Sequence, residues 1–289
     1  MMQIINQIYW DQINAGYMAG TSLKKTANEI VKFKNELMPP GKTIMKWSSS
    51  LNYQAHKEVP RLPILLSNKT YKLVIDLDVK PVDTAIFCLK FFDLQTNEIK
   101  KIIFTEKEMT FIYPSNAVSY TLEIINSGCK EIYFKRIQLG EVSLPDEAFT
   151  DFYPVEIHQC GNKKMLAVLL IADSKRAREI NNYVLPDHLG FNLIIGYLSW
   201  QKSTLQIKEL TKLLNHYASE KVVLLSTSKN TDTFLQKIGS NLNSSTEVVL
   251  AKQLVENESS SMENHWLKES INSTNIQDAI SKVIEYFKE

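Results

Sequence analysis

The sequence predicts an α+β chain of two domains: an N-terminal antiparallel β-sandwich of the jelly-roll kind, followed by a C-terminal α/β domain with a small parallel sheet. One reason is that apolar and polar residues alternate with a period of two along much of residues 71–139. A second reason is that strand-like and helix-like segments alternate from Met165 onward. The third is the length of 289 residues, which is close to two average domains.

The N-terminal half consists of short strands separated by turns. Apolar residues at 71, 73, 75, 77 and 79 share one face of a strand that Pro81 ends, and positions 85, 87, 89 and 91 repeat the pattern. Asn126-Ser127-Gly128 is a strong turn signal. Further strands are predicted at Glu98–Thr105, Met109–Tyr113, Val118–Ile125 and Glu131–Leu139. Many short strands in succession favour an antiparallel sandwich or jelly roll.

The C-terminal half opens with a continuous apolar run, Met165–Ala172, which is typical of a strand buried on both faces. Asp173 and Ser174 then cap a predicted helix over residues 175–183. The remaining predicted elements are strands at 192–198, 222–225 and 247–250 and helices at 205–217, 231–238 and 275–288. Alternating strands and helices predict a parallel sheet.

These patterns divide the chain into a β-sandwich over residues 1–142, a connector over 143–163 and an α/β domain over 164–289. The connector is predicted because Pro145, Pro154 and several acidic residues stand there. Residues 1–140 hold 18 basic and 13 acidic residues, whereas residues 141–289 hold 15 and 19. This mild asymmetry supports two units, but it is too weak to indicate nucleic-acid binding.

Several classes of protein are disfavoured by composition. The three cysteines are scattered and no Cys/His cluster has zinc spacing, so neither a disulfide framework nor a metal site is expected. The longest purely apolar run is far shorter than a membrane span and no signal peptide is visible. We expect a cytoplasmic protein, with peripheral placement at the inner face of the cell membrane left open. Phosphate-binding glycine loops are also missing, so no cofactor is expected.

Catalytic candidates in the α/β half lie after its predicted strands, where open sheets place their ligands. They are Asp173-Ser174, Ser199-Trp200 and Ser226-Thr227-Ser228. Ala172-Asp173-Ser174 is similar to the nucleophile block of SGNH-type esterases, which also need an Asp-x-x-His motif. The only late histidine is His265, and Met262 stands three residues before it. Ser174 is therefore kept as an alternative nucleophile, and helix capping is the favoured interpretation.

Binding candidates in the β half are aromatic and polar. Trp47 precedes three serines, and Asn52, Tyr53 and Gln54 follow a few residues later. Aromatic rings flanked by amide and hydroxyl groups suit a sugar, because its C–H face stacks on the ring while its hydroxyls bond to the polar groups. The alternative is that Trp47 and Tyr53 are core and rim residues of the sandwich. We expect Trp47 to be structural and Tyr53 to face a ligand.

The same residues belong to an ordered set that resembles a known family over about residues 1–140. The set comprises Tyr9-Trp10-Asp11-Gln12-Ile13-Asn14, Leu37-Met38-Pro39-Pro40-Gly41, Trp47-Ser48-Ser49, Asn52-Tyr53-Gln54-Ala55, Leu62-Pro63-Ile64-Leu65, Tyr71-Lys72-Leu73, Phe91-Phe92-Asp93, Tyr113-Pro114 and Ile124-Ile125-Asn126-Ser127-Gly128-Cys129. It is similar to the third member (Asp-three) of the accessory Sec proteins of Gram-positive bacteria. The resemblance implies a β-sandwich like that of carbohydrate-binding modules.

The resemblance also implies a non-catalytic adaptor in the export of serine-rich-repeat glycoproteins. The implied partners are the two sister accessory Sec proteins, the accessory motor ATPase with its channel, and the glycosylated adhesin. The rival hypothesis is a small esterase or acyltransferase in the α/β half, with the sandwich as its carbohydrate-targeting module. The α/β half lies outside the resemblance, so its role stays open.

Overall fold

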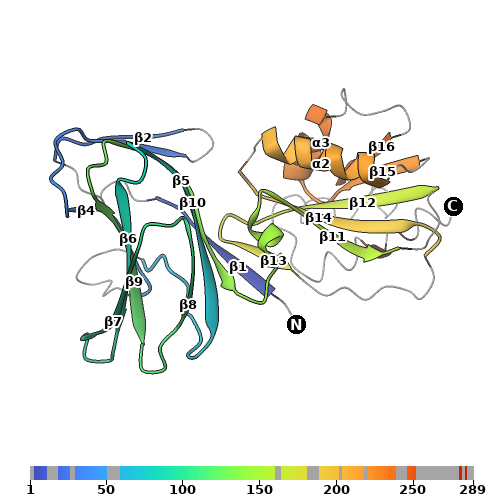
Figure 1. Cartoon of the computed structure of the whole chain (residues 1–289). Coiled ribbons are helices and arrows are strands. Elements are labelled where there is room, and N and C mark those ends of the chain that lie inside the picture. Colours follow the sequence, from blue (N-terminus) through green and yellow to red (C-terminus); the bar gives the residue numbers. More distant parts are fainter. Residues whose placement is uncertain are drawn as a thin grey trace, which may run out of the picture. The chain divides into compact units, whose positions relative to one another are not determined.

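The computed structural model divides into two compact units, Ile5–Leu144 and Pro145–Glu289, and the second also takes Met1–Ile4 (Figure 1). The residues it describes are 3–11, 19–26, 30–50, 59–159, 164–180, 189–201, 204–217, 221–238, 246–251, 280, 281 and 284. In these ranges, no helix is long and apolar enough to cross a membrane.

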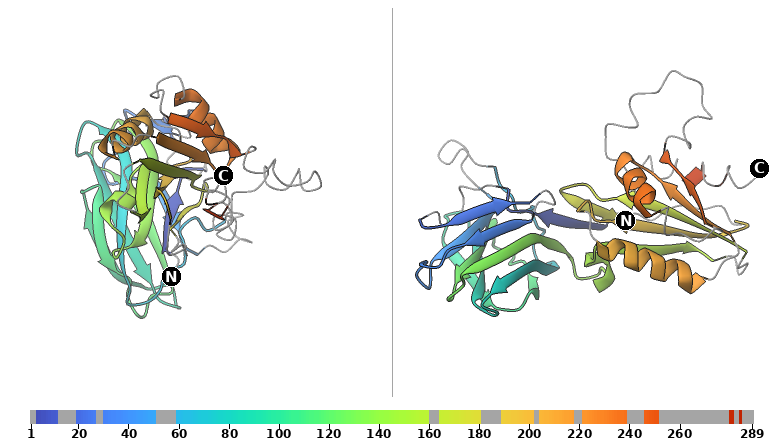
Figure 2. Two further views of the ribbon diagram at one scale, coloured as in Figure 1. Left: turned by 90° about the vertical axis from the view of Figure 1, so that its right-hand side faces the viewer. Right: turned by 90° about the horizontal axis from the view of Figure 1, so that it is seen from above.

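The unit Ile5–Leu144 is a sandwich of two antiparallel sheets, which Figures 1 and 2 show as separate layers. One sheet has the order β1 (Gln3–Ile8), β10 (Glu131–Glu141), β3 (Val31–Lys34), β2 (Ser22–Lys25), and β5 (Thr70–Lys80) pairs with both β10 and β8 (Glu108–Ile112). The other has the order β4 (Thr43–Ser48), β9 (Ser119–Asn126), β6 (Ala85–Phe92), β7 (Glu98–Phe104). The predicted strands of this half are thus present, with ends that differ by one or two residues.

The period-two alternation decides which residues fill the space between these sheets. Leu73, Ile75 and Leu77 of β5 face Phe87 and Leu89 of β6, and all belong to one buried cluster. Burying apolar side chains of this size contributes about 1.5–3 kcal/mol each. The alternating polar residues lie on the outer faces of the two sheets.

The turn predicted at Asn126-Ser127-Gly128 is confirmed, and its geometry explains the residue types. Oδ1 of Asn126 accepts hydrogen bonds from the backbone N–H groups of Gly128 at 3.0 Å and of Cys129 at 2.6 Å. Nδ2 of Asn126 donates to the carbonyl oxygen of Met38 at 2.7 Å. Gly128 has φ of +103°, a conformation that residues with a Cβ rarely adopt.

The unit that begins at Pro145 contains a five-stranded sheet. Its order is β11 (Phe152–His158), β14 (Asn192–Leu198), β12 (Met165–Ala172), β15 (Lys221–Ser226), β16 (Thr246–Val249). β11 is antiparallel to β14, and the other neighbours are parallel. Apolar residues of α2 (Thr204–Tyr217) and α3 (Lys229–Ile238) join one core cluster with one face of this sheet.

Two predictions for this unit are wrong. Residues 143–163 do not form a bare connector, because their described part contains a 3-10 helix η2 (Asp146–Phe149) and the edge strand β11. The helix predicted over 175–183 is replaced at Ala177–Ile180 by strand β13, and residues 181–183 lie outside the described residues. Arg178 and Ile180 are buried while Glu179 between them is exposed, which is the period of a strand.

The predicted C-terminal helix at 275–288 falls almost wholly outside the described residues. Ile280, Ser281 and Ile284 are described, and all three are helical. Ile280 and Ile284 are buried, as expected for residues four apart on one helix face.

Candidate functional site

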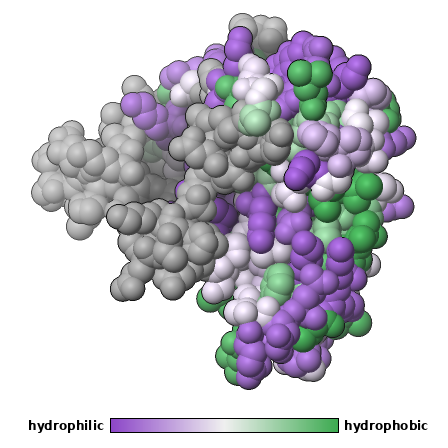
Figure 3. All heavy atoms as spheres, turned by 90° about the vertical axis from the view of Figure 1, so that its left-hand side faces the viewer, coloured by the Kyte–Doolittle hydropathy of each residue, from purple (hydrophilic) through white to green (hydrophobic). Residues whose placement is uncertain are grey.

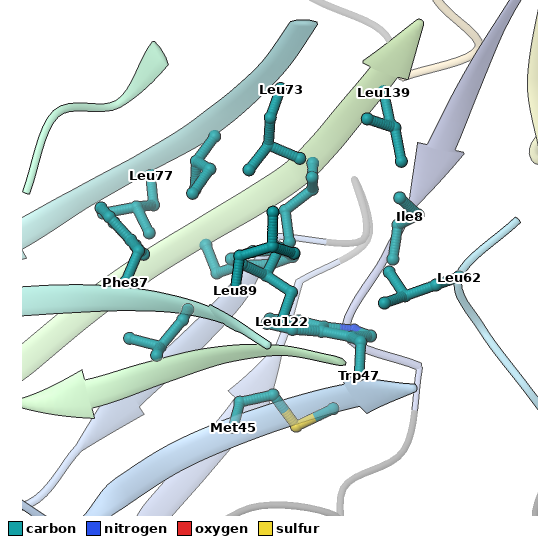
Figure 4. Close-up of a cluster of buried hydrophobic side chains, with 14 of the residues drawn as sticks. Ile8, Met45, Trp47, Leu62, Leu73, Leu77, Phe87, Leu89, Leu122 and Leu139 are labelled. Atoms are coloured by element: carbon teal, nitrogen blue, oxygen red, sulfur yellow. The ribbon is translucent and has the colours of Figure 1, made fainter. Parts of the chain in front are cut away.

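Trp47 lies in the core of the sandwich. Its side chain is 1% exposed, and its ring stacks on Phe134 with a centroid distance of 5.3 Å and meets the edge of Trp10 at 6.3 Å. Figure 4 shows the indole between the two sheets, beside Leu122 and Leu62. A sugar therefore cannot stack on this ring, and the alternative that makes Trp47 structural is the one the geometry supports.

The other three binding candidates, Asn52, Tyr53 and Gln54, lie outside the described residues. The chain on either side of them is described and hydrogen-bonded. The carbonyl oxygen of Ser48 accepts from the backbone N–H groups of Arg61 at 3.0 Å and Leu62 at 3.1 Å. The chain thus leaves β4 at Ser48 and is back beside Ser48 at Arg61.

The end of β4 is also tied to the neighbouring strand β9. The backbone N–H of Ser49 donates to the carbonyl oxygen of Tyr120 at 3.0 Å, and the N–H of Tyr120 donates to Oγ of Ser49 at 2.9 Å. Tyr120 in turn donates its hydroxyl to the carbonyl oxygen of Pro63 at 2.8 Å. The described residues that flank the three binding candidates therefore adjoin an anchored part of the sandwich.

Charged side chains lie near this hydrogen-bonded end of β4. A guanidinium nitrogen of Arg61 lies 3.5 Å from Oδ2 of Asp11, and Nζ of Lys25 lies 3.7 Å from Oδ1 of the same carboxylate. Arg61 keeps 36% of its side chain exposed, so part of its donor fork is open to solvent or to a ligand. These N–H groups can donate to an oxygen acceptor of a bound molecule.

The alternative nucleophile, Ser174, sits after β12 at the carboxyl end of the parallel strands. Its Oγ accepts from the backbone N–H groups of Ala177 at 3.0 Å and Arg176 at 3.3 Å, and donates to the carbonyl oxygen of Ala177 at 3.0 Å. These bonds close the turn that leads into β13, so the Ser174 hydroxyl satisfies backbone groups of a turn and does not cap a helix. Across the described ranges, no histidine is hydrogen-bonded to Ser174, as a serine nucleophile would require.

The neighbouring Asp173 forms a buried ion pair that sequence reasoning missed. Nε of Arg178 donates to both carboxylate oxygens of Asp173, at 3.0 and 2.9 Å, and both side chains are fully buried. Nη1 of Arg178 donates to the carbonyl oxygens of Ala148 at 2.6 Å and Thr150 at 2.9 Å. The pair is five residues apart across an unpredicted turn, so no sequence periodicity marks it. Its bonds fit a structural role, because they fasten β13 to η2.

The hydroxyl groups after β15 are likewise bonded within the unit. Oγ of Ser226 lies 2.6 Å from Oγ1 of Thr231, and Oγ1 of Thr227 donates to the carbonyl oxygen of Leu170 at 2.8 Å. Oγ of Ser228 accepts from the backbone N–H of Thr231, so Ser228 caps the start of α3, and Oγ1 of Thr231 accepts in return from the backbone N–H groups of Thr227 and Ser228. Ser199 and Trp200, the remaining candidates at this edge, follow β14. Within the described ranges, no group of three His, Cys, Asp or Glu side chains could hold a metal ion.

Comparison with known proteins gives the chain a family. A family model described as the accessory Sec secretory system ASP3, the Asp-three family, matches residues 16–141. The Asp-three accessory Sec system protein of Streptococcus gordonii is 30% identical over 146 residues, which cover 47% of this chain and 92% of that protein. This chain belongs to the Asp-three family. The resemblance predicted from the ordered motifs is thereby confirmed, and a role in the accessory Sec system follows.

Two further relatives extend beyond the sandwich. The Asp-three protein of Staphylococcus aureus is 24% identical over 182 residues, which cover 63% of this chain and 53% of that protein. A chain in the Gap123 (Glycosylation Associate Protein) complex of Streptococcus agalactiae superposes with a TM-score of 0.57 at 23% identity. That superposition covers 85% of this chain and 78% of the other, so the likeness of fold reaches past the residues matched by the family model.

Proposed function

We propose that this member of the Asp-three family is a non-catalytic, cytoplasmic adaptor of the accessory Sec system. It binds the two sister accessory Sec proteins and the glycosylated serine-rich-repeat adhesin, and delivers the adhesin to the accessory motor ATPase and channel. Family membership carries this proposal. The Streptococcus agalactiae structure, which is a Gap123 complex, supports the part that concerns sister proteins.

The non-catalytic part is supported by the carboxyl ends of the parallel strands. There the hydroxyl of Ser174 is bonded to the backbone of its own turn, and Asp173 is held by Arg178. A serine esterase needs a free hydroxyl beside a base. The rival esterase hypothesis predicts turnover of a generic ester that is lost in Ser174→Ala. We expect no difference between that variant and the unchanged protein.

The carbohydrate part of the proposal assigns the sugar contact to Asn52, Tyr53 and Gln54. Support comes from the composition of that segment and from the residues that flank it. The backbone N–H of Arg61 is hydrogen-bonded to the carbonyl oxygen of Ser48, and the guanidinium of Arg61 is partly exposed. One stacked aromatic ring contributes about 0.5–1.5 kcal/mol beyond its buried area. Tyr53→Ala should therefore weaken binding of an N-acetylglucosamine-modified serine-rich peptide several-fold.

The experiment uses the full chain and two readouts. Affinity for the glycosylated peptide and for the same peptide without sugar is measured by calorimetry, and the urea midpoint is measured on the same samples. Tyr133→Ala, a tyrosine of the other sheet, is the matched control. Co-expression with the two sister proteins followed by size-exclusion chromatography tests the assembly. Failure to co-elute would contradict the adaptor proposal, and equal affinity for both peptides would contradict its carbohydrate part.

A further inference from the structure

The outer face of the four-stranded sheet β4-β9-β6-β7 presents a second group of polar and aromatic residues. Because Tyr120, Leu122 and Ile124 of β9 point into the core, Thr121 and Glu123 lie on the opposite face. Figure 3 looks onto the side of the sandwich that carries β4, β9 and β7, where hydrophilic and hydrophobic residues lie next to one another. We use "Thr121 face" for Lys46, Ser48, Lys90, Phe92, Thr121 and Glu123.

The strand register brings these residues together. Thr121 stands directly opposite Ser48 of β4 on one side and Lys90 of β6 on the other. Glu123 stands opposite Lys46. Phe92 is two residues beyond Lys90 on the same face of β6, so it lies diagonally next to Thr121.

Thr121 carries a hydroxyl group that is not satisfied. The residue is 6% exposed, and its Oγ1 has no hydrogen-bond partner in the described structure. A buried polar atom without a partner costs about 1–3 kcal/mol, so such atoms are rare unless another group completes them. This hydroxyl lies on the outer face of a sheet and is not in the core between the two layers.

Glu123 adds an acceptor next to a set of donors. Its carboxylate is buried, and both oxygens lie 3.1 Å from Nζ of Lys90. Nζ of Lys46 lies 3.8 Å from Oε1, and Lys101 of β7 stands opposite Lys90. The side chains of Lys46 and Lys90 are 52% and 23% exposed. A ligand that reaches Thr121 would have to displace the flexible stems of these two lysines.

The apolar part of the face is Phe92. Its side chain is partly buried, and on β9 it stands opposite the small residue Ser119. A large ring beside a small neighbour leaves one side of the ring uncovered by that strand. Rings in this position accept the C–H face of a sugar, with polar groups at the rim to bind its hydroxyls.

We propose that the Thr121 face is a carbohydrate-binding surface, on which a sugar ring packs against Phe92 while its hydroxyls bond to Thr121, Glu123 and Lys90. The inference rests on the proposed function, since it supplies a site for the glycan of the adhesin in addition to Asn52, Tyr53 and Gln54. The chemistry selects a neutral polyhydroxyl ligand. The Lys90–Glu123 pair places hydrogen-bond donors beside acceptors, and a hydroxyl group, which both donates and accepts, can bond to either.

The test uses the full chain with the N-acetylglucosamine-modified peptide and its sugar-free counterpart as probes. Thr121→Val keeps the shape of the side chain and removes the hydroxyl, and Phe92→Ala removes the ring. Thr110→Val on the exposed face of β8 is the matched control for the hydroxyl. We expect Thr121→Val and Phe92→Ala to weaken glycopeptide binding by about three- to tenfold, as the loss of one net contact predicts. Thr110→Val should bind as the unchanged protein does.

The urea midpoint of each variant separates binding from folding. Thr121→Val should unfold at the same or a slightly higher urea concentration, because it removes an unsatisfied buried group. If the unchanged chain distinguishes the two peptides but neither variant alters the affinity, the Thr121 face is not the site, although carbohydrate binding stands. If the unchanged chain does not distinguish the peptides, the carbohydrate part of the proposed function and this site are both overturned.

Discussion

The indole Nε1–H of Trp47 donates a 3.1 Å hydrogen bond to the backbone carbonyl oxygen of Tyr9. Trp47 belongs to β4 of one sheet, and Tyr9 follows β1 of the other, so the bond joins the two layers of the sandwich. Buried indole N–H groups generally have such a partner. This arrangement explains why a tryptophan, rather than another large apolar residue, stands at position 47.

Trp47→Ala should lower the free energy of unfolding by about 3–5 kcal/mol, because it leaves a cavity where a fully buried ring had packed. Urea unfolding monitored by circular dichroism measures the change. Leu37→Ala, at an exposed position, is the control and should change stability by less than about 0.5 kcal/mol. Unchanged stability in Trp47→Ala together with weaker glycopeptide binding would contradict a structural role for this residue.

Removing only one partner of the ion pair between Arg178 and Asp173 should strongly lower the free energy of unfolding. Arg178→Met leaves a buried carboxylate without its guanidinium, and a loss of about 3–5 kcal/mol is expected. The double variant Asp173→Leu with Arg178→Met should lose less than the sum of the two single variants, because it leaves no uncompensated charge.

A surface ion pair of the same unit provides the control for that experiment. Lys221 and Glu247 are 3.0 Å apart and both are well exposed. Lys221→Met should therefore cost no more than about 1 kcal/mol. Similar losses for Arg178→Met and Lys221→Met in chemical denaturation would show that the buried pair contributes little.

Gly196 should not tolerate a side chain. It lies in β14, between β11 and β12, and a Cβ placed there would come within 2.7 Å of the ring of Phe152 and 2.9 Å of Cδ2 of Leu170. Gly196→Ala should cost about 1–3 kcal/mol through overpacking. Gly190→Ala meets no atom within 4 Å and serves as the matched control. Equal thermal midpoints for the two variants would contradict close packing at position 196.

The thiol of Cys129 should make stability fall in alkaline solution. Burial raises its pKa from 9.0 to about 11. Between these two values the unfolded chain loses the thiol proton while the folded chain keeps it, so folding becomes less favourable as the pH rises. The full difference corresponds to about 2–3 kcal/mol.

The free energy of unfolding of the unchanged protein and of Cys129→Ala is measured from about pH 8 to about pH 10.5. Over this range the free energy of unfolding should fall more steeply with pH in the unchanged protein. The variant starts from a lower stability because it lacks the sulfur atom, but its stability should decline less steeply. Parallel declines in the two proteins would mean that the thiol pKa is not raised in the folded state.

The sequence by itself predicted the elements whose local pattern and tertiary role agree. The alternation at residues 71–79 marked β5, the apolar run at 165–172 marked β12, and the Asn126-Ser127-Gly128 turn was visible from residue types alone. Hydrophobic periodicity reports which face of a strand is buried, and turn chemistry is local, so neither depends on distant residues. The ordered N-terminal motifs likewise identified the family.

Tertiary contacts decided what periodicity could not. Residues 177–180 form a sheet strand, accompanied by the bonds of the Ser174 hydroxyl to Ala177 and of the Arg178 guanidinium to Asp173 and Ala148, and neither the strand nor these contacts follow from helix propensity. The aromatic ring of Trp47 suits either a core or a sugar, and only the packing of the two sheets buried it. Thr121 belonged to none of the sequence motifs, and Phe92 stood in one, Phe91-Phe92-Asp93, that carried no binding role. Their proximity on one face arises from the register of β9 against β6, which hydrogen bonding between strands far apart in the sequence determines.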